Sequence, residues 1–330
     1  MKSHSSTGLR QRTLHTTLIT GLAAAAMLIS PLASADNRVT YKSAKAGTSY
    51  YQMGVELAQA MKDGTNGDII VTLEESQGSV QNVMEAPNRK GNYVFTTPPS
   101  LVSSASEGKG PFQKNPNPKF QDIRALFPIP ALTMHFVTRE DSGIKNFSDM
   151  QGKNILIGKG TFSAREGEKY LKLFGLEGKV NLSNVELNNA VPAMKNKQID
   201  AFVTAGSFPS PNVIEAAASM PLNILSMTEE QVKQTGAAKA VIPANTYSGQ
   251  TEEITTTSLP VIAYTTTGMD DDTAYTLTKT FWEQRDKMAN SAPWWKGVTP
   301  DQLMNVQGKI HPGALKYYAE KGIAVPDSAK

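Results

Sequence analysis

Two short loops of this sequence combine the residue types that bind small anions. Glycines, hydroxyls and a basic side chain come together in the loop at 158–163, and the loop at 47–50 repeats the combination beside Lys45. Glycine lets the backbone approach a ligand closely, and free N–H groups at a helix N-terminus favour negative charge. The candidate binding residues of these two segments are Gly47, Thr48, Ser49, Tyr50, Lys159, Gly160, Thr161, Phe162, Ser163 and Arg165. Together they predict a small polar cleft that prefers an anion.

Polar residues at other strand ends extend this candidate site. Ser76, Ser79, Thr97 and Ser207 each follow or end an expected strand, where ligands bind in open parallel sheets. A structural role stays open for each loop, because Ser163 and Glu166 also have the spacing of a helix capping box.

Other chemistry finds little support in the sequence. The loop at 158–163 falls one residue short of a dinucleotide-binding G-x-G-x-x-G, and Glu186 stands too late to be its acidic partner. Neither a phosphate-binding G-x-x-x-x-G-K-[ST] nor a G-x-S-x-G motif occurs. His135 lies inside an apolar strand and His311 precedes a helix, so we interpret both as structural. The sequence has no cysteine and no metal-ligand spacing, so we expect no cofactor, no metal and no enzyme.

The first 35 residues have the order of a cleavable secretory signal. Lys2, Arg10 and Arg12 precede an apolar run of about a dozen residues, shorter than the ~20 that span a bilayer. Ala33-Ser34-Ala35 then offers the small residues of a cleavage site. Without these residues the chain would carry 30 basic and 30 acidic side chains, which argues against nucleic-acid binding. The absence of cysteine excludes a lipoprotein anchor, so we expect a freely diffusing periplasmic protein.

Strands and helices alternate in two similar modules. Strands are expected at 38–43, 68–73 and 93–97, and the pattern restarts with strands at 154–157 and 199–203. Helices between them, such as 163–174, make these crossover units on mostly parallel sheets. Two further strands, at 131–137 and 255–266, separate the modules and are expected to cross between them. We therefore predict two α/β lobes rather than one larger sheet, followed by a helical C-terminal region whose three tryptophans pack in the core.

Several pieces of this sequence, in their order and spacing, resemble the TAXI family, the substrate-binding subunits of one branch of tripartite TRAP transporters. They run from the first glycine loop to the C-terminal helices. The pieces are Gly47-Thr48-Ser49-Tyr50-Tyr51, Gly54-Val55-Glu56-Leu57-Ala58, Gly78-Ser79-Val80-Gln81-Asn82, Asp141-Ser142-Gly143-Ile144, Asp149-Met150-Gln151-Gly152-Lys153, Ile199-Asp200-Ala201-Phe202, Ile242-Pro243-Ala244-Asn245-Thr246-Tyr247-Ser248-Gly249-Gln250 and His311-Pro312-Gly313-Ala314-Leu315-Lys316-Tyr317-Tyr318.

The resemblance implies a two-lobed α/β fold of the type II-like periplasmic binding proteins. Each lobe would hold a mixed, mostly parallel sheet flanked by helices, with a hinge and a ligand cleft between the lobes. The expected divisions are a signal peptide at 1–35, lobe 1 at 36–137 plus 255–330, and lobe 2 at 138–254.

The resemblance also implies a function, which is capture of a small organic anion by lobe closure and delivery to inner-membrane TRAP permease subunits driven by an ion gradient. Matching positions would place Thr48, Ser49, Tyr50, Ser79 and Asn82 on the ligand from lobe 1, and 160–163 and Ser207 from lobe 2. We expect a monomer that is not itself embedded in the membrane.

The ligand class is the least fixed part of this prediction. Family members commonly have a longer Gly/Ser/Pro run at the second loop and often a glutamine where Thr97 stands. Glutamate is associated with the family, and Lys159 or Arg165 would suit a second carboxylate. We therefore predict a dicarboxylate such as 2-oxoglutarate or a glutamate-like acid. A binding protein of an ATP-driven importer, a signalling receptor and a periplasmic enzyme on the same scaffold stay open as alternatives.

Overall fold

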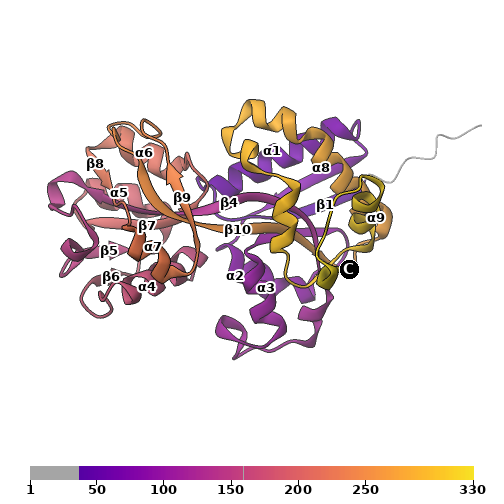
Figure 1. Ribbon diagram of the computed structural model, residues 1–330, viewed down its shortest axis with the longest axis horizontal. Coiled ribbons are helices and arrows are strands. Elements are labelled where there is room, and N and C mark those ends of the chain that lie inside the picture. Colours follow the sequence, from indigo (N-terminus) through magenta and orange to yellow (C-terminus); the bar gives the residue numbers. More distant parts are fainter. Residues whose placement is uncertain (1–36, 159) are drawn as a thin grey trace, which may run out of the picture. The chain divides into compact units, whose positions relative to one another are not determined.

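Two long antiparallel strands, β4 (Ile123–Arg139) and β10 (Ile254–Thr266), run side by side through the middle of the protein (Figure 1). The computed structural model describes residues 37–158 and 160–330. The predicted signal peptide and Lys159 lie outside the described residues. None of the helices in these two ranges is long and apolar enough to cross a membrane.

On one side of β4 and β10 lies the unit that we call lobe 1. Strands β1 (Asn37–Lys42), β2 (Ile69–Glu74) and β3 (Tyr93–Thr97) pair in parallel in the order β2-β1-β3, and β10 joins β3 in the antiparallel sense. The short β11 (Lys309–Ile310) pairs with β4. The helices of lobe 1 are α1 (Ser49–Gly64), α2 (Ser79–Glu85), α3 (Pro99–Ser106), α8 (Asp271–Ser291) and α9 (Pro312–Glu320).

On the other side lies lobe 2, which repeats the parallel arrangement. Here β7 (Ala201–Gly206), β5 (Asn154–Leu156) and β6 (Asn181–Ser183) pair in parallel, and β7 joins β4 in the antiparallel sense. Two edge strands, β8 (Leu222–Ile224) and β9 (Ala238–Ile242), pair with β4 and β10. The helices are α4 (Phe162–Leu173), α5 (Ala190–Lys195), α6 (Pro211–Ser219) and α7 (Glu229–Thr235).

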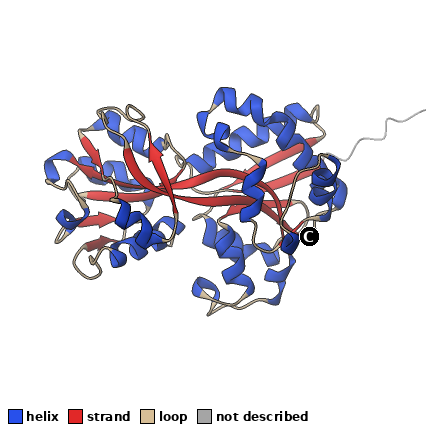
Figure 2. Ribbon diagram, viewed as in Figure 1, coloured by secondary structure: helices blue, strands red, loops and turns tan. Residues whose placement is uncertain are grey.

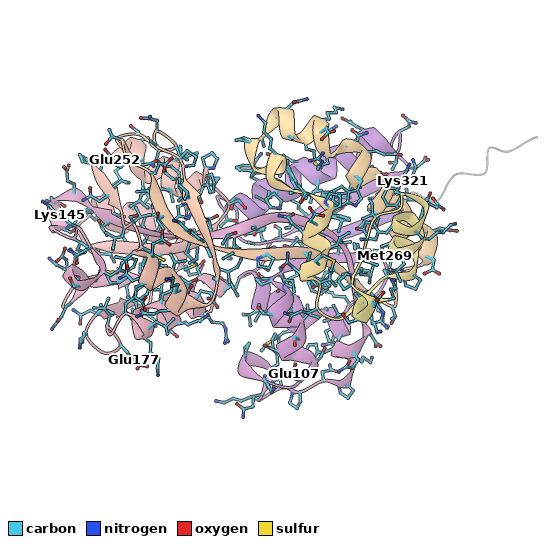
Figure 3. The ribbon with its side chains drawn as sticks, in the orientation of Figure 1. Glu107, Lys145, Glu177, Glu252, Met269 and Lys321 are labelled. Carbon is cyan, nitrogen blue, oxygen red and sulfur yellow. The ribbon has the colours of Figure 1, made fainter. Side chains whose placement is uncertain are left out.

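Helices flank the strands of both lobes (Figure 2), so inner strands such as β3 and β7 are buried on two faces. In lobe 2 the alternation of side chains along a strand divides the core into two clusters. Phe136 and Val203 enter the cluster under α4, while Val137 and Phe202 enter the cluster under α5 and α6. Charged side chains such as Glu107 and Lys145 lie at the exposed surface (Figure 3). Burial on both faces explains why these strands read as continuous apolar runs in the sequence.

Helix α1 shows how the sequence positions a loop at a strand end. Thr48 caps its N-terminus, and its Oγ1 accepts a hydrogen bond from the Tyr51 N–H at 3.3 Å. Met53, Leu57 and Met61 recur every four residues and form its buried face. Gly54 belongs to the same face, where a Cβ atom would lie 3.0 Å from Leu73 and 3.3 Å from Tyr41. The helix therefore packs tightly on β1 and β2, and its first turn is fixed at the carboxyl end of β1.

The predicted two-lobed α/β fold with mixed sheets is confirmed, and the two strands expected to cross between lobes do so. The predicted separation into two sheets is wrong in one respect, because pairing is continuous from β2 to β6 along the order β2-β1-β3-β10-β4-β7-β5-β6. The exact boundaries at 137/138 and 254/255 stay a prediction, since they fall on β4 and β10, which serve both lobes.

Strand β4 is longer than predicted, because it begins at Ile123 rather than near residue 131. Pro128 and Pro130 in its first half look like strand breakers in the sequence. In the structure the register of the β4–β10 pair shifts between Leu259 and Val261, opposite this segment. A bulge removes the need for a regular ladder of N–H donors, so the prolines are accommodated.

Of the three C-terminal tryptophans predicted to pack in the core, Trp295 lies in it, whereas Trp282 and Trp294 pack against it and are partly buried. Trp294 and Trp295 share one carboxylate. Trp295 is fully buried, and its indole Nε1 donates to Glu56 Oε2 at 2.6 Å. Trp294 Nε1 donates to the same oxygen at 3.0 Å. Glu56 lies on α1, so this charged acceptor ties the C-terminal segment to the helix that begins at the first glycine loop.

Replacing Glu56 with leucine should destabilise the protein, because the buried Trp295 N–H loses its acceptor. Leaving such a donor unsatisfied costs about 1–3 kcal/mol. We expect a fall of that size in the free energy of unfolding, measured by urea denaturation. The control is Glu283→Leu on α8, where Glu283 is exposed and pairs only with Lys279 among the described residues. Equal destabilisation by both variants would contradict a specific role for Glu56.

Candidate functional site

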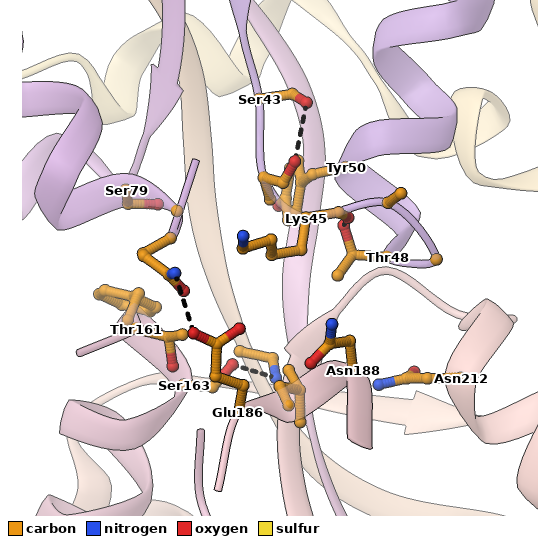
Figure 4. A pocket seen from close by; sticks show the side chains of 18 of the residues that line it. Ser43, Lys45, Thr48, Tyr50, Ser79, Thr161, Ser163, Glu186, Asn188 and Asn212 are labelled. Carbon is orange, nitrogen blue, oxygen red and sulfur yellow. Dashed lines mark hydrogen bonds between the residues drawn. The ribbon is translucent and has the colours of Figure 1, made fainter. Parts of the chain in front are cut away.

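A cavity of about 240 Å³ lies between lobe 1 and lobe 2 (Figure 4). Its walls are the loops and helix N-termini that follow β1, β2, β5 and β7, together with the segment after β6. Lobe 1 lines it with 43–48, Tyr50, 77–79, Thr96 and Leu132, and lobe 2 lines it with 161–163, 186–188, Val191, Ala205, Asn212 and Glu215. The cavity thus lies where the carboxyl ends of the parallel strands of both lobes meet.

The N-terminus of α1 forms one wall. Thr48 Oγ1 donates to the Lys45 carbonyl at 2.7 Å, which fixes the turn that contains Gly47. Gly47 has a φ of +83°, a conformation that glycine adopts without strain. Tyr50 is buried one turn along, and its Oη donates to the Pro130 carbonyl of β4 at 3.1 Å. Gly47, Thr48 and Tyr50, all predicted binding residues, therefore lie together on this wall.

The N-terminus of α2 forms the neighbouring wall. Gly78 occupies the N-cap with a φ of +98°, and its N–H donates to Ser76 Oγ at 2.8 Å. Ser76 Oγ in turn donates to the Ser43 carbonyl at 2.9 Å. Asn82 is fully buried and donates to the carbonyls of Ser43 at 2.8 Å and Thr96 at 3.2 Å. Ser79 lines the cavity, whereas Ser76 and Asn82 hold the loops that carry it.

On lobe 2 the N-terminus of α4 faces the cavity. Thr161 is the N-cap, and its Oγ1 accepts from the Ala164 N–H at 3.1 Å and donates to the Gly158 carbonyl at 2.6 Å. The predicted capping box that begins at Ser163 is wrong, because the helix begins at Phe162 and Ser163 lies inside it. Ser163 Oγ instead accepts from the Ala205 N–H of β7 at 2.8 Å. Thr161, Phe162 and Ser163 all line the cavity.

Other predicted binding residues lie behind or beside the cavity rather than on its walls. Thr97 is fully buried, and the adjacent Thr96 lines the cavity in its place, because successive side chains of β3 point to opposite faces. Arg165 is exposed on α4, and a Cβ atom on Gly110 of lobe 1 would lie 3.4 Å from its guanidinium. The described predicted residues outside the lining are Ser49, Ser76, Asn82, Thr97, Gly160, Arg165 and Ser207. Lys159 lies outside the described residues.

Ser49 and Ser207 bridge the lobes at the back of the cavity. The Ser207 N–H donates to Ser49 Oγ at 3.1 Å, and Ser207 Oγ donates to the Ala131 carbonyl of β4 at 2.6 Å. A methyl group on Gly206 would lie 2.7 Å from Ser49 Oγ, so only glycine fits there without a shift. Ser49 and Ser207 therefore join α1 to the end of β7 rather than line the cavity.

Several polar lining residues were not predicted as binding residues. Lys45 and Glu186 point into the space between the lobes, as do Asn188 and Asn212 (Figure 4). Gln77 Nε2 donates to Glu186 Oε1 at 3.5 Å, which links lobe 1 to lobe 2 across the cavity. Glu186 follows β6, which the sequence analysis did not recognise as a strand. The rule that ligands bind beyond strand ends would have indicated Glu186 once β6 was identified.

His135 is buried in β4, the apolar strand in which it was predicted, and it makes a buried hydrogen-bond chain. Its Nδ1 donates to the Thr133 carbonyl at 3.0 Å, so its Nε2 accepts from Tyr247 Oη at 2.9 Å. Tyr247 Oη in turn accepts from the Ser210 N–H at 2.9 Å. Burial disfavours the imidazolium and lowers the pKa of His135 to about 4, although the hydrogen bond to Thr133 opposes this. His311 caps α9 far along lobe 1, where its Nδ1 accepts from the Gly313 N–H at 3.2 Å.

The lowered pKa of His135 predicts a loss of stability in acid. In the unfolded chain this histidine titrates near its ordinary value of 6.5, so between pH 6.5 and about 4 the unfolded state binds the proton more readily. Its contribution is therefore fully present above pH 6.5 and is lost as the pH falls towards 4. Urea unfolding of the wild type and of His135→Gln at pH 7, 5.5 and 4.5 measures this. The variant should lose less stability over that range, and parallel losses would show that His135 does not titrate this way.

Within residues 37–158 and 160–330 no group of three or more histidine, aspartate or glutamate side chains is arranged to hold a metal ion. The chemistry that the described lining offers is hydrogen bonding and charge: backbone N–H groups at three helix N-termini, hydroxyls, amides, one lysine and two glutamates.

Comparison with known proteins shows which family the sequence matches and which solved structures share this architecture. A model of the NMT1-like family matches residues 42–322. The periplasmic binding protein BugD gives a TM-score of 0.55 at 14% sequence identity, over 88% of this chain and 99% of that one. A protein from Bordetella bronchiseptica RB50 gives a TM-score of 0.50 at 18% identity, over 88% and 91% of the two chains. The predicted fold class, that of the two-lobed periplasmic binding proteins, is thereby confirmed.

Proposed function

The chain belongs to the NMT1-like family, and on that premise we propose that it is a periplasmic solute-binding protein that captures a small organic acid by closing its two lobes. The observation that carries this proposal is the cavity between the lobes, which three helix N-termini approach from both sides. Its volume of about 240 Å³ suits a small molecule rather than a polymer.

The walls favour a carboxylate. The first N–H groups of α1, α2 and α4 have no partner within their own helices, and the dipoles of these helices favour negative charge at this end. Lys45 adds a positive charge on the lobe 1 side. Hydrogen bonds to a charged group contribute about 1.5–3 kcal/mol each, so a few of them hold a small anion without covalent chemistry.

The connection between the lobes suits closure. Among the described strands, only β4 and β10 run through both lobes, and a bulge interrupts their pairing between Leu259 and Val261. Hinge closure around a ligand concentrates the change in such a short segment. Closure would remove water from the cavity and strengthen each polar contact.

The proposal also covers where the protein works and how it delivers the bound solute. The resemblance of the sequence to the TAXI family supports transfer of the solute to an inner-membrane TRAP permease, by a monomer that an N-terminal signal exports to the periplasm. An ATP-driven importer or a signalling receptor would use the same capture step. An enzyme is the weaker alternative, because His135 is buried and hydrogen-bonded behind the cavity rather than on its walls.

A dicarboxylate such as 2-oxoglutarate or a glutamate-like acid remains the proposed ligand class. Of the two cations that suggested it, Arg165 lies outside the lining and Lys159 lies outside the described residues. Lys45 is the basic side chain that the described lining offers to a carboxylate.

Ligand capture by closure predicts a smaller radius of gyration when the solute binds. Small-angle scattering of the purified protein, with each member of a panel of organic acids, should show this compaction for the acids that also raise Tm. The stoichiometry by calorimetry should be one. An acid that raises Tm without compaction would argue against closure, and turnover of the bound acid would favour the enzyme alternative.

Ser79 provides a direct test of the lining. Its hydroxyl faces the cavity at the start of α2 and has no hydrogen-bond partner among the described residues. Losing one hydrogen bond to a charged ligand is worth about 1.5 kcal/mol or more, so Ser79→Ala should weaken binding about tenfold. The matched control is Ser100→Ala in the first turn of α3, outside the cavity, which should leave Kd unchanged. Equal Kd values for both variants would remove Ser79 from the binding site.

A further inference from the structure

A tyrosine hydroxyl lies buried behind the lobe 1 wall of the cavity without a partner. Tyr41 of β1 is 3% exposed, and its Oη makes no hydrogen bond in the described structure. Most buried polar groups in proteins are hydrogen-bonded, because an unsatisfied one destabilises the fold. Phenylalanine would fill the same space without leaving a polar atom unsatisfied. Packing alone therefore does not account for the hydroxyl of Tyr41.

The sheet register places Tyr41 and Thr96 on the same face of lobe 1. Tyr41 pairs with Val94 of the parallel strand β3, and Thr96 stands two residues further along that strand. The ring of Tyr41 packs under α1, where a Cβ atom on Gly54 would lie 3.3 Å from it. Thr96 and Tyr50, from the first turn of α1, both line the cavity, whereas Tyr41 does not. The side chain of Tyr41 thus lies between α1 and the sheet, on the inner side of this part of the wall.

The pKa values of the buried tyrosines agree with this placement. Burial raises the pKa of Tyr41 well above its ordinary value, and the Thr96 side chain opposes this rise. Burial also raises the pKa of Tyr50, and the neighbouring Tyr41 raises it further. The Tyr41 hydroxyl therefore lies near both residues. It stays protonated at neutral pH, so it can donate a hydrogen bond.

The hydroxyl of Thr96 is available as the acceptor. The Thr96 carbonyl accepts from Asn82 Nδ2 at 3.2 Å, whereas its Oγ1 makes no hydrogen bond with another described residue. A threonine hydroxyl can accept one hydrogen bond and donate another. When its oxygen accepts from behind the wall, its hydrogen is left to point into the cavity. A hydroxyl that accepts in this way is polarised and becomes a stronger donor.

Resting on the proposed function, we propose that Tyr41 is a positioning residue of the binding site. Its Oη donates to Thr96 Oγ1, and this directs the Thr96 hydrogen to a carboxylate oxygen of the bound solute. Because a carboxylate can only accept, the chain of hydrogen bonds runs in one direction, from Tyr41 through Thr96 to the solute. Tyr41 acts on the solute without touching it.

Tyr41→Phe separates this role from a structural one. The variant removes an unpartnered oxygen, so its Tm should equal or exceed that of the wild type. Its Kd should rise about fivefold, because Thr96 loses the group that orients and polarises its hydroxyl. Calorimetric titration at pH 7 with 2-oxoglutarate, with glutamate and with any acid that native mass spectrometry finds co-purified measures this Kd. An unchanged Kd, or a Tm lower by several degrees, would overturn the assignment.

Tyr93→Phe is the matched control. Tyr93 is also buried, and its Oη also makes no hydrogen bond in the described structure, but it lies at the start of β3 and outside the lining. Removing its hydroxyl should leave Kd unchanged. A weakening equal to that of Tyr41→Phe would show that loss of either buried hydroxyl acts on binding through the fold, which contradicts a specific role for Tyr41.

A double-mutant cycle tests whether Tyr41 acts through Thr96. Thr96→Val keeps the shape of the side chain and removes the donor, so Kd should rise about tenfold. Tyr41→Phe should add nothing in the Thr96→Val background, because the residue through which it acts is gone. Additive effects of the two substitutions would contradict the chain of hydrogen bonds.

Failure of this assignment is distinguishable from failure of the proposed function. If an acid binds to the wild type and to Tyr41→Phe with the same Kd, the assignment is wrong and the proposed function stands. If no acid binds to the wild type and none co-purifies with it, both are wrong.

Discussion

The pairing of β4 with β10 is the interaction on which the rest of the structure depends. These two strands are shared by both lobes, and each half of the parallel sheet is built outward from one of them: β3, β1 and β2 beyond β10, and β7, β5 and β6 beyond β4. Because the strands of each half run parallel, their carboxyl ends meet at one edge. The shared pair turns these two edges towards each other, so the cavity is a consequence of the topology rather than of any single residue.

Within this frame, the same local arrangement is repeated on both sides of the cavity. A strand ends, a glycine with positive φ turns the chain, and a threonine caps the next helix: Gly47 and Thr48 in lobe 1, Gly160 and Thr161 in lobe 2. Each cap satisfies one N–H of its helix and leaves others free to face the cavity. One serine and one asparagine just behind the walls, Ser76 and Asn82, hold the loops in place. Polar residues near the cavity thus divide into those that face it and those that position it.

The sequence was informative where a residue's role is local. Thr48 and Thr161 were predicted because a hydroxyl between a glycine turn and a helix is a local pattern. The choice between Thr96 and Thr97 was not accessible, since β3 is buried on both faces and its sequence lacks the alternation that distinguishes one face from the other.

Glu186 and Glu215, the acidic residues of the described lining, could not be predicted from the sequence for a different reason. Glu186 and Glu215 are exposed residues of two segments that come together only through the packing of α5 and α6, and no spacing in the sequence connects them. Arg165 was expected in the cavity, but the helix that carries it begins at Phe162, and this places its side chain beside lobe 1 at Gly110 instead.

The contact between Ser49 and the end of β7 has a mechanical meaning. Gly206 leaves no room for a side chain beside Ser49 Oγ, and the Ser207 N–H donates to that oxygen, so the lobes are in close contact here. If the lobes close as proposed, this contact would serve as a pivot at the back of the cavity. Thr48, which lines the cavity, is the neighbouring residue in the chain, so a ligand would act close to the pivot. A small displacement there would give a larger movement at the distant rims of the lobes.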